Sequence, residues 1–166
     1  MIFQIDGISG TGKTTVAEEL SRRGYTALDA DEAFGYYGNP ETGEPTDVQI
    51  QHNWIWDIDK VKSLAESSEN NTIFVCGGAM NQDRARGIFD KRFTLVVDND
   101  TMRHRLMTRT SNDFGKHPDD LARQLEWNQG AVEYAKSIGA IVIDATKPIE
   151  RVVDDILSKS GIGTTR

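Results

Sequence analysis

The segment GISGTGKT, Gly7 to Thr14, limits how this chain can fold more than any other part of it. It follows a short apolar run, IFQID, and it precedes TTVAEELSRRG, in which apolar residues recur at helical spacing. Between a strand and a helix, the pattern G-x-x-x-x-G-K-[ST] predicts a loop whose backbone N–H groups surround phosphate oxygens. The chain is therefore expected to begin an α/β fold with a phosphate-binding loop.

The residues of this loop have separate expected roles. Glycine allows the backbone to approach phosphate closely, and the N-terminus of the following helix adds about half a positive charge. Lys13 is expected to reach the outer phosphates, and the Thr14 hydroxyl is expected to ligate Mg²⁺. The predicted nucleotide-binding residues here are Gly7, Gly10, Thr11, Gly12, Lys13, Thr14 and Thr15.

Strand-like and helix-like segments alternate along the rest of the chain. Further strands are expected at YTALD, TIFVCGG, FTLVVD and AIVID. Helices are expected at IDKVKSLAESS, DRARGIFDK, TMRHRLMTRT, DDLARQLEWNQGAVEYAKS and IERVVDDILSKSG, followed by a frayed tail, IGTTR. This alternation predicts a single α/β domain over residues 1–166, with a five-stranded parallel sheet covered on both faces.

Composition narrows the class of partner. The chain has 166 residues and a formal net charge of −7, so a broad nucleic-acid-binding surface is not expected. The N-terminus lacks the features of a signal peptide, and no apolar stretch approaches the roughly 20 residues that cross a bilayer. A cytoplasmic protein, as a monomer or small homo-oligomer, is therefore expected. The single cysteine, Cys76, follows an apolar run and is expected to be a packed side chain.

Two classes of P-loop protein lack the sequence signals they need. A signalling GTPase reads its base with Asn-Lys-x-Asp, which this sequence does not contain. Motor and AAA-type ATPases usually end the third strand in acidic residues, whereas here that strand ends in VCGG. Neither GTP-dependent signalling nor ATP hydrolysis coupled to motion is therefore expected.

At four places the sequence resembles the small P-loop kinases, the group that contains adenylate kinase, shikimate kinase and gluconate kinase. The first is the loop itself, and the second is LDADEAF, similar to the Asp-x-Asp after the second strand of shikimate and gluconate kinases. The third is RHRLMTR, similar to a helix with two functional arginines. The fourth is DATKPIERVVDDIL, which looks like the adenine-contacting turn of adenylate kinases. The resemblance implies a three-layer P-loop NTPase fold with strand order 2-3-1-4-5, a short lid, and ATP and Mg²⁺ as cofactors.

The resemblance also implies roles on the acceptor side. Asp29 would help to organise Mg²⁺, and Asp31 would bind the group that receives the phosphoryl group. An acceptor hydroxyl would need Asp31 to orient it, whereas an acceptor phosphate would need no base. The alternative is that Asp29 and Asp31 are only a strand end and a helix cap.

On the nucleotide side, the resemblance implies that Arg105 stacks on adenine. Arg109, four residues later on the same predicted helix face, would reach phosphate from a lid at about residues 110–118. The adenine would be held by the turn Thr146, Lys147 and Pro148, which is also an ordinary way to enter a helix. The implied catalytic residues are Lys13, Asp31, Arg105 and Arg109.

An acidic segment, DEAFGYYGNPETGEPTD, favours one kind of acceptor over another. It carries five carboxylates, and between Gly24 and Asp59 the chain has no Lys or Arg. A nucleoside monophosphate kinase grips its acceptor with arginines from this region and from Gly-Phe-Pro-Arg, which is here Gly78-Ala79-Met80-Asn81. Because a carboxylate-rich pocket repels an anion, a neutral or cationic hydroxyl compound is preferred, such as a nucleoside, sugar or amino sugar.

The acceptor segment is expected at about residues 30–60. Its aromatic residues would stack on a ring or face a cation, unless they belong to the core. Trp54 and Trp56 cannot share one helix face, so one of them is expected to meet a ligand or the lid. The predicted acceptor-binding residues are Asp31, Phe34, Trp54, Gly77, Gly78 and Arg84. Two alternatives stay open: a nucleoside monophosphate kinase with Arg84 and Arg86 as phosphate clamps, and a regulatory module that binds ATP without transfer.

Overall fold

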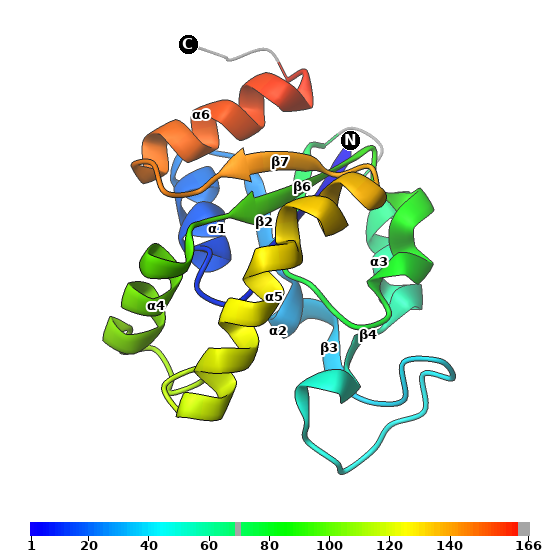
Figure 1. Cartoon of the computed structure of the whole chain (residues 1–166). Coiled ribbons are helices and arrows are strands. Elements are labelled where there is room, and N and C mark those ends of the chain that lie inside the picture. The colour runs from blue at the N-terminus through cyan, green and yellow to red at the C-terminus, as the bar shows by residue number, and fades with distance from the viewer. Residues whose placement is uncertain (69–70, 163–166) are drawn as a thin grey trace.

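A parallel sheet forms the middle layer of the computed structural model, which describes residues 1–68 and 71–162 (Figure 1). Within these residues the sheet has five strands in the order β2-β5-β1-β6-β7, all parallel. Their bounds are Ile2–Asp6 (β1), Thr26–Asp29 (β2), Ile73–Cys76 (β5), Lys91–Val96 (β6) and Ile141–Asp144 (β7). Counted among these strands alone, the order is 2-3-1-4-5, so the predicted fold class and strand order are confirmed.

Helices cover both faces of this sheet. The bounds are Lys13–Arg22 (α1), Ala30–Phe34 (α2), Ile58–Ser67 (α3), Asn99–Thr108 (α4), Pro118–Ser137 (α5) and Ile149–Ser160 (α6). On one face α1 and α6 pack together over a core that includes Phe3 and Ile5 of β1. A second cluster, with Ile2 and Val75, packs against α3 on the other face. Side chains of β1 thus alternate between two apolar cores, as a strand buried on both faces requires.

One local prediction differs from the structure, one is refined by it, and one is not tested by it. The short helix predicted at DRARGIFDK is a 3₁₀ helix, η2 (Gln82–Ile88). Helix α4 ends at Thr108, so Arg109 is its C-cap residue and does not lie on the helix with Arg105. The predicted frayed tail, IGTTR, lies beyond Gly161, and residues 163–166 are outside the described residues.

The acidic segment supplies the first strand of a small antiparallel hairpin that the sequence pattern did not reveal. Strands β3 (Gly35–Tyr37) and β4 (Trp54–Trp56) pair in it, and a 3₁₀ helix, η1 (Gln51–Asn53), leads into β4. The two tryptophans therefore lie on a strand, where the helix-face argument does not apply. Trp56 is buried in the second core cluster, whereas Trp54 stays half-exposed.

Asn81 fastens this hairpin to the segment that precedes η2. Its side-chain Oδ1 accepts a hydrogen bond from the backbone N–H of Trp56 at 2.9 Å, and its Nδ2 donates to the Trp56 carbonyl at 2.9 Å. The asparagine is only 4% exposed. At the place where the kinase pattern has an arginine, this chain therefore uses a buried amide to hold two backbone groups.

Replacing Asn81 by alanine is expected to lower the free energy of unfolding by about 2–6 kcal/mol. The reason is that two buried backbone groups of Trp56 would lose their partners, at about 1–3 kcal/mol each. Urea denaturation followed by tryptophan fluorescence measures the change. As a control, Asn39→Ala removes an exposed loop amide that accepts from Glu41 and Thr42. Equal stability of the two variants would contradict a structural role for Asn81.

Cys76 has the environment that the sequence indicates. It is buried in the first core cluster, and burial raises the pKa of its thiol to about 12. The side chain is therefore an un-ionised, packed group at neutral pH. No helix of the described residues is both long enough and apolar enough to cross a bilayer.

Candidate active site

The loop between β1 and α1 is closed around its own lysine. Gly12 has a φ of +100°, a conformation that favours glycine, and α1 begins directly after it at Lys13. The Thr11 hydroxyl donates to the Ile8 carbonyl at 2.8 Å, and the Lys13 ammonium donates to the carbonyls of Gly7 and Ile8. The loop backbone therefore wraps around the Lys13 ammonium, and the N-terminus of α1 lies at the end of the same loop.

Three carboxylates lie close enough to Lys13 to stabilise its positive charge. Burial lowers the pKa of Lys13, while the negative charges of Asp6, Asp31 and Asp29 act in the opposite direction. These residues come from the ends of two parallel strands and from the first turn of α2. Carboxyl ends of parallel strands meet at one edge of a sheet, which explains why residues far apart in sequence converge here.

Asp29 and Asp31 have different surroundings. Asp29 ends β2 and caps α2, accepting the N–H groups of Asp31 at 2.9 Å and Glu32 at 3.4 Å. Asp29 therefore caps α2, and its expected role at Mg²⁺ stays a prediction. The Asp31 carboxylate instead accepts a hydrogen bond from the Trp54 indole at 3.0 Å. Partial burial raises the pKa of Asp31, and the Trp54 hydrogen bond opposes that rise.

Asp6 is a carboxylate that the sequence reasoning missed as a site residue. Its Oδ1 accepts the Gly7 N–H at 2.6 Å, and its Oδ2 accepts from the Gln82 side chain at 2.9 Å. A Cβ atom on Gly78 would lie 2.3 Å from Asp6 Oδ1, so glycine at position 78 leaves room for this carboxylate. An acid at the end of a buried strand, directly before the loop, is the signal that would have found it.

A buried chain of polar side chains holds Asp6 in place. The Gln82 side chain accepts from Gln4 Nε2 at 2.7 Å, and Gln4 Oε1 in turn accepts from Arg92 Nε at 2.8 Å. All three residues are buried. Arg92 also lies 3.7 Å from the Asp83 carboxylate. Because each side chain is fixed by the next, Asp6 is presented to the site in one orientation.

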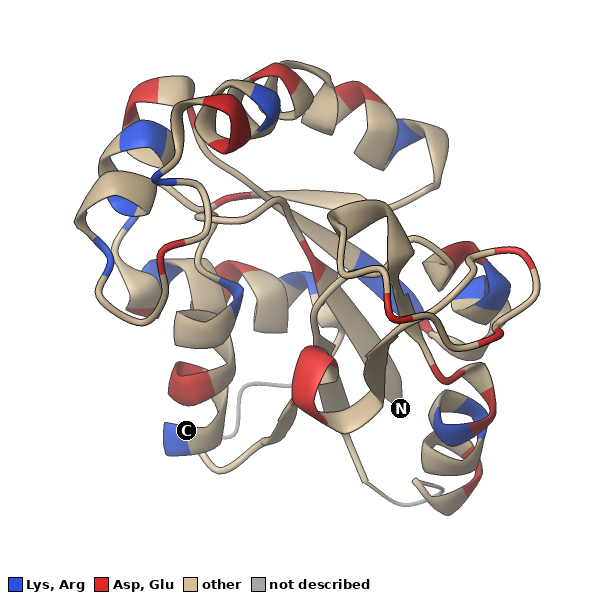
Figure 2. Cartoon of the chain, turned by 90° about the horizontal axis from the view of Figure 1, so that it is seen from below, with Lys and Arg blue, Asp and Glu red and all other residues tan. Residues whose placement is uncertain are grey.

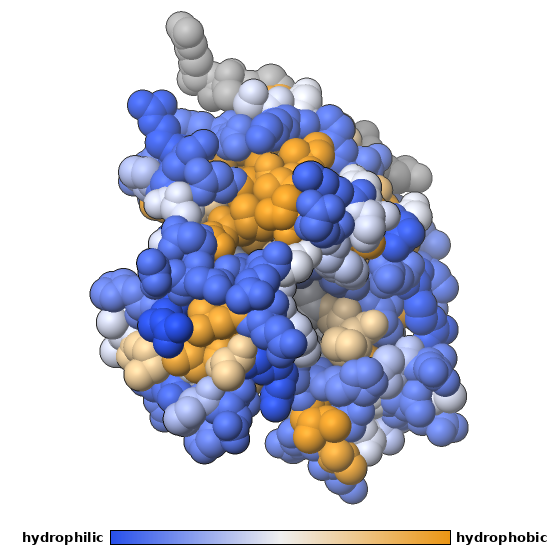
Figure 3. Space-filling view, in the orientation of Figure 1, coloured by the Kyte–Doolittle hydropathy of each residue, from blue (hydrophilic) through white to orange (hydrophobic). Residues whose placement is uncertain are grey.

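These groups face one large cleft. It has a volume of about 1250 Å³ and is lined by Lys13, Asp31, Asp6, Trp54 and Gly78. Figure 3 shows the surface hollowed beside α5 and above the β3–β4 hairpin. The phosphate-binding loop, Asp31 and part of the predicted lid segment therefore share a single cavity.

The charge around this cleft is mainly negative. Its acidic lining residues are Asp6, Asp31, Asp83, Asp120 and Glu126, and its basic ones are Lys13, Arg109 and Arg123. Figure 2 shows acidic residues on α2 and along the hairpin segment, while Lys and Arg gather on α4 and the segment after it. Of the five carboxylates of the acidic segment, only Asp31 lines the cleft. The residues of the hairpin segment that line it are uncharged: Tyr37, Gln49, Ile50, Gln51 and Trp54.

Arg105 of α4 and Arg109, directly after this helix, are both anchored at the loop. Arg105 donates to the Thr11 carbonyl at 3.1 Å and to the Ala145 carbonyl at 2.9 Å. Arg109 donates to the Ser9 hydroxyl at 3.1 Å and to the Phe114 carbonyl, and burial lowers its pKa. Although Arg109 lies past the end of α4, the structure brings both arginines to the phosphate-binding loop.

The predicted adenine turn lies beside Arg105. The Thr146 backbone N–H and hydroxyl donate to the Asp144 carboxylate at 3.0 and 2.6 Å, which shapes the turn directly after Ala145. Pro148 is the N-cap residue of α6, and the Lys147 ammonium lies 4.0 Å from Asp144. The turn and the loop are therefore joined through the Arg105 guanidinium.

The predicted lid segment, residues 110–118, has no helix or strand until Pro118 begins α5. Asn112 and Phe114 from this segment line the cleft. The Arg109 guanidinium carbon lies 5.8 Å from the centre of the Phe114 ring, within cation–π range. Arg109 therefore links this segment to the phosphate-binding loop.

Not all predicted acceptor residues come together. Asp31, Trp54 and Gly78 line the cleft. Phe34 instead packs edge-on against Trp56 in the core, with ring centres 6.3 Å apart, so the core alternative is correct for it. Two further predicted residues, Gly77 and Arg84, are not among the residues that line the cleft, and Arg84 is exposed on η2.

The residues predicted for Mg²⁺ fit such an ion. Thr14 lies in the first turn of α1 with an exposed side chain, and Asp29 lies close enough to Lys13 to influence its pKa. Within residues 1–68 and 71–162, no three His, Cys, Asp or Glu side chains gather into a metal cage. Mg²⁺ beside phosphate usually takes only one or two oxygen ligands from protein and keeps several waters, and Thr14 and Asp29 each carry such an oxygen.

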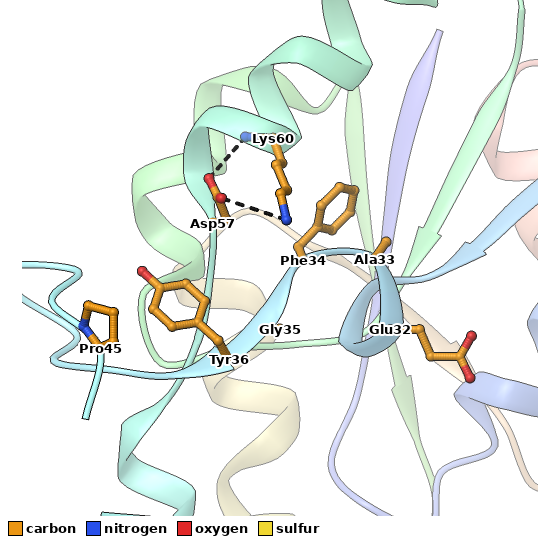
Figure 4. A pocket seen from close by; sticks show the side chains of 8 residues that line it. All are labelled: Glu32, Ala33, Phe34, Gly35, Tyr36, Pro45, Asp57 and Lys60. Carbon is orange, nitrogen blue, oxygen red and sulfur yellow. Dashed lines mark hydrogen bonds and ion pairs between the residues drawn. The ribbon is translucent and has the colours of Figure 1, made fainter. Parts of the chain in front are cut away.

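A second hollow lies on the other side of the hairpin and is less suited to a ligand. Figure 4 shows Phe34, Tyr36, Asp57 and Lys60 around its volume of about 400 Å³. Two of its three charged residues already pair, since Asp57 accepts the Lys60 N–H at 3.1 Å and lies 4.0 Å from the Lys60 ammonium. The large cleft is therefore the candidate active site.

Similar solved structures are small P-loop kinases, which confirms the resemblance in fold. A sugar kinase from Janibacter sp. is 22% identical, with a TM-score of 0.58 and coverage of 98% of this chain and 95% of that chain. A shikimate kinase from Acinetobacter baumannii is 14% identical, with a TM-score of 0.66 and coverage of 99% and 95%. A deoxyadenosine kinase from M. mycoides is 16% identical, with a TM-score of 0.55 and coverage of 96% and 99%.

Comparison by sequence gives a family. Among curated proteins, no sequence matches this chain. The family model described as "AAA domain" matches residues 4–126, which include the phosphate-binding loop, the acidic segment, both arginines and the start of α5. Over this range the chain belongs to the AAA domain family.

Proposed function

We propose that the protein is an ATP-dependent phosphotransferase that moves the γ-phosphoryl group of MgATP to a small hydroxyl compound. The acceptor is neutral or cationic, such as a nucleoside, a sugar or an amino sugar. The observation that carries the proposal is that Lys13 and Asp31 line one cleft in which acidic residues outnumber basic ones. Such a cleft favours a hydroxyl acceptor over a phosphate acceptor.

The chain's own residues suit phosphoryl transfer, which depends on positioning and charge neutralisation. Lys13 and the backbone of the loop bind the phosphates, and Arg109 is placed at the same loop to compensate charge. Mg²⁺, held through Thr14 and Asp29, supplies further neutralisation of the phosphate oxygens. Arg105 and the Thr146–Pro148 turn are proposed to hold adenine.

Asp31 is proposed to act on the acceptor. Its carboxylate accepts the hydrogen bond of the acceptor hydroxyl and takes the proton as the oxygen bonds to the γ-phosphorus and ADP leaves. A raised pKa suits this role, because it makes the carboxylate a better proton acceptor. The segment from Asn112 to Phe114 is placed to cover the cleft and exclude water, which competes with the acceptor.

The nucleoside monophosphate kinase alternative depends on Arg84 and Arg86. Both are exposed on η2, and Arg86 pairs with Asp83 at 2.9 Å. Arg84→Ala and Arg86→Ala are therefore each expected to change kcat/KM for the true acceptor by less than about threefold, the range of ordinary surface substitutions. A loss of 100-fold or more with a nucleoside monophosphate as acceptor would instead support the phosphate-clamp alternative.

The proposal is tested by ADP release with separate acceptors at steady state. The panel holds the nucleosides, their 5′-monophosphates, D-glucose, gluconate, shikimate and D-glucosamine. Turnover of a neutral or cationic compound at roughly 1–100 per second supports the proposal. Turnover of monophosphates alone would replace it with the monophosphate kinase alternative. ATP binding without turnover of any acceptor would favour the regulatory-module alternative.

A further inference from the structure

One face of α5 presents aromatic side chains to the cleft. Trp127 and Tyr134 both line it, although they are 42% and 46% exposed. Gly130 and Ala131 lie between them on the same helix face and line the cleft too. Large aromatic side chains left exposed inside a cavity favour a ligand that covers them.

Gly130 is the part of this face that the fold itself does not explain. Glycine inside a helix is less stable than alanine, and Gly130 has no positive φ that would require it. A Cβ atom built there would meet nothing within 4 Å, so no neighbour in the described structure needs the space. The missing side chain instead leaves a flat ledge of backbone between Trp127 and Tyr134.

A buried polar group lines the same cleft as this ledge. It is Thr94 of β6, which pairs with Asp6 of β1 in the sheet and is only 4% exposed. Within the described part of the chain, its hydroxyl has no hydrogen-bond partner. A buried hydroxyl without a partner is unusual, and it is available to a ligand that carries a donor or acceptor.

The cleft also extends well beyond the phosphoryl-transfer groups. Its lining runs along α5 from Asp120 to Tyr134, and 14 residues of helix cover about 21 Å. A single sugar ring fills only a part of that length. The part of the cleft along α5 therefore leaves room for more of a ligand than one sugar ring.

We propose that Trp127, Gly130 and Tyr134 form a subsite for a planar, uncharged or cationic ring of the acceptor, with Thr94 as its polar partner. The ring lies on the Gly130 backbone, and the attached hydroxyl-bearing portion extends towards Asp31 and Lys13. This inference rests on the proposed function, because both use the same cleft. It selects ring-bearing acceptors of nucleoside size over free sugars.

Binding without transfer tests the subsite. Adenosine, cytidine and D-ribose are the probes, and saturation-transfer NMR and calorimetry on the full chain measure where and how tightly each one binds. The nucleosides are expected to bind with the strongest saturation at their base protons. Gly130→Leu fills the ledge and is expected to raise the nucleoside Kd at least about tenfold, a loss typical of one base stack.

The melting temperature of each variant distinguishes a loss of nucleoside binding from a folding defect. Gly130→Ala is expected to raise Tm by about 2–4 °C, since alanine favours the helix, while it weakens nucleoside binding. Glu133→Leu is the matched control, because the Glu133 side chain is 81% exposed and does not line the cleft. It is expected to leave nucleoside binding unchanged.

Two results would overturn the subsite: no binding of either nucleoside to the unaltered protein, or an unchanged nucleoside Kd in Gly130→Leu. Neither result decides the proposed function. Transfer to D-glucosamine without nucleoside binding would keep the phosphotransferase and remove the subsite. Nucleoside binding that depends on Gly130, without transfer to any acceptor, would keep the subsite and remove the phosphotransferase.

Discussion

Replacing Lys13 by alanine is expected to lower kcat for phosphoryl transfer on the order of 10³-fold. The Lys13 ammonium lies inside the loop and is the basic group most closely held by it, through the carbonyls of Gly7 and Ile8. In the transition state, charge spreads over the oxygens of the transferred group, and the loop backbone alone compensates only part of it. The rate of ADP release with saturating acceptor measures the loss.

The stability of this variant distinguishes a catalytic role from a structural one. Burial lowers the pKa of Lys13, so its protonated form is less favourable in the folded protein than in the unfolded chain. Removing the charge is therefore not expected to lower Tm. Lys116→Ala is the control, because Lys116 pairs with Asp113 in the segment over the cleft and is expected to have a much smaller effect. A Lys13→Ala protein that folds and keeps full activity would contradict the proposed role of the loop.

Replacing Asp31 by asparagine is expected to lower kcat with a hydroxyl acceptor by about 10²–10⁴-fold, the usual contribution of a positioned base. The Trp54 indole can still donate to the amide oxygen, so the local geometry is expected to remain. ATP binding, measured by calorimetry, is expected to change little. Full transfer activity in this variant would show that Asp31 is not the base.

The pH dependence follows from the same carboxylate. Burial raises the pKa of Asp31 above its ordinary 3.8, so activity is expected to fall with decreasing pH at a higher pH than an exposed aspartate would cause. The Trp54 hydrogen bond stabilises the charged form and lowers this pKa. Trp54→Phe removes that bond, and the acid limb of kcat/KM is therefore expected to move further towards neutral pH. A shift in the opposite direction would contradict Asp31 as the titrating group.

Sequence reasoning was sufficient where a local pattern determines a structure. GISGTGKT predicts its own strand–loop–helix setting, and alternation of apolar runs predicts the parallel sheet. The positions of Asp29 and Asp31 follow directly from β2, because Asp29 is its last residue and Asp31 lies in the first turn of the helix after it. These features depend on residues that are neighbours in the chain.

Other features depend on residues that meet only in three dimensions. The chain from Arg92 through Gln4 and Gln82 to Asp6 joins β6, β1 and η2, and no spacing in the sequence reveals it. The separation of Trp54 from Trp56 was also unpredictable, because it depends on a hairpin that pairs across 16 intervening residues. The role of Asn81 could not be predicted from the sequence either, because it depends on a contact with the backbone of Trp56, 25 residues away.

The measurement to make first is ³¹P NMR of the protein with MgATP and pooled acceptors: nucleosides, nucleoside monophosphates, shikimate, gluconate and amino sugars. We expect a new phosphomonoester signal from a neutral or cationic acceptor, absent with Lys13→Ala, which would establish transfer to a hydroxyl group in the acidic cleft. A new diphosphate signal from a monophosphate would show that the cleft accepts an anion despite its carboxylates, and the proposed acceptor class would be wrong.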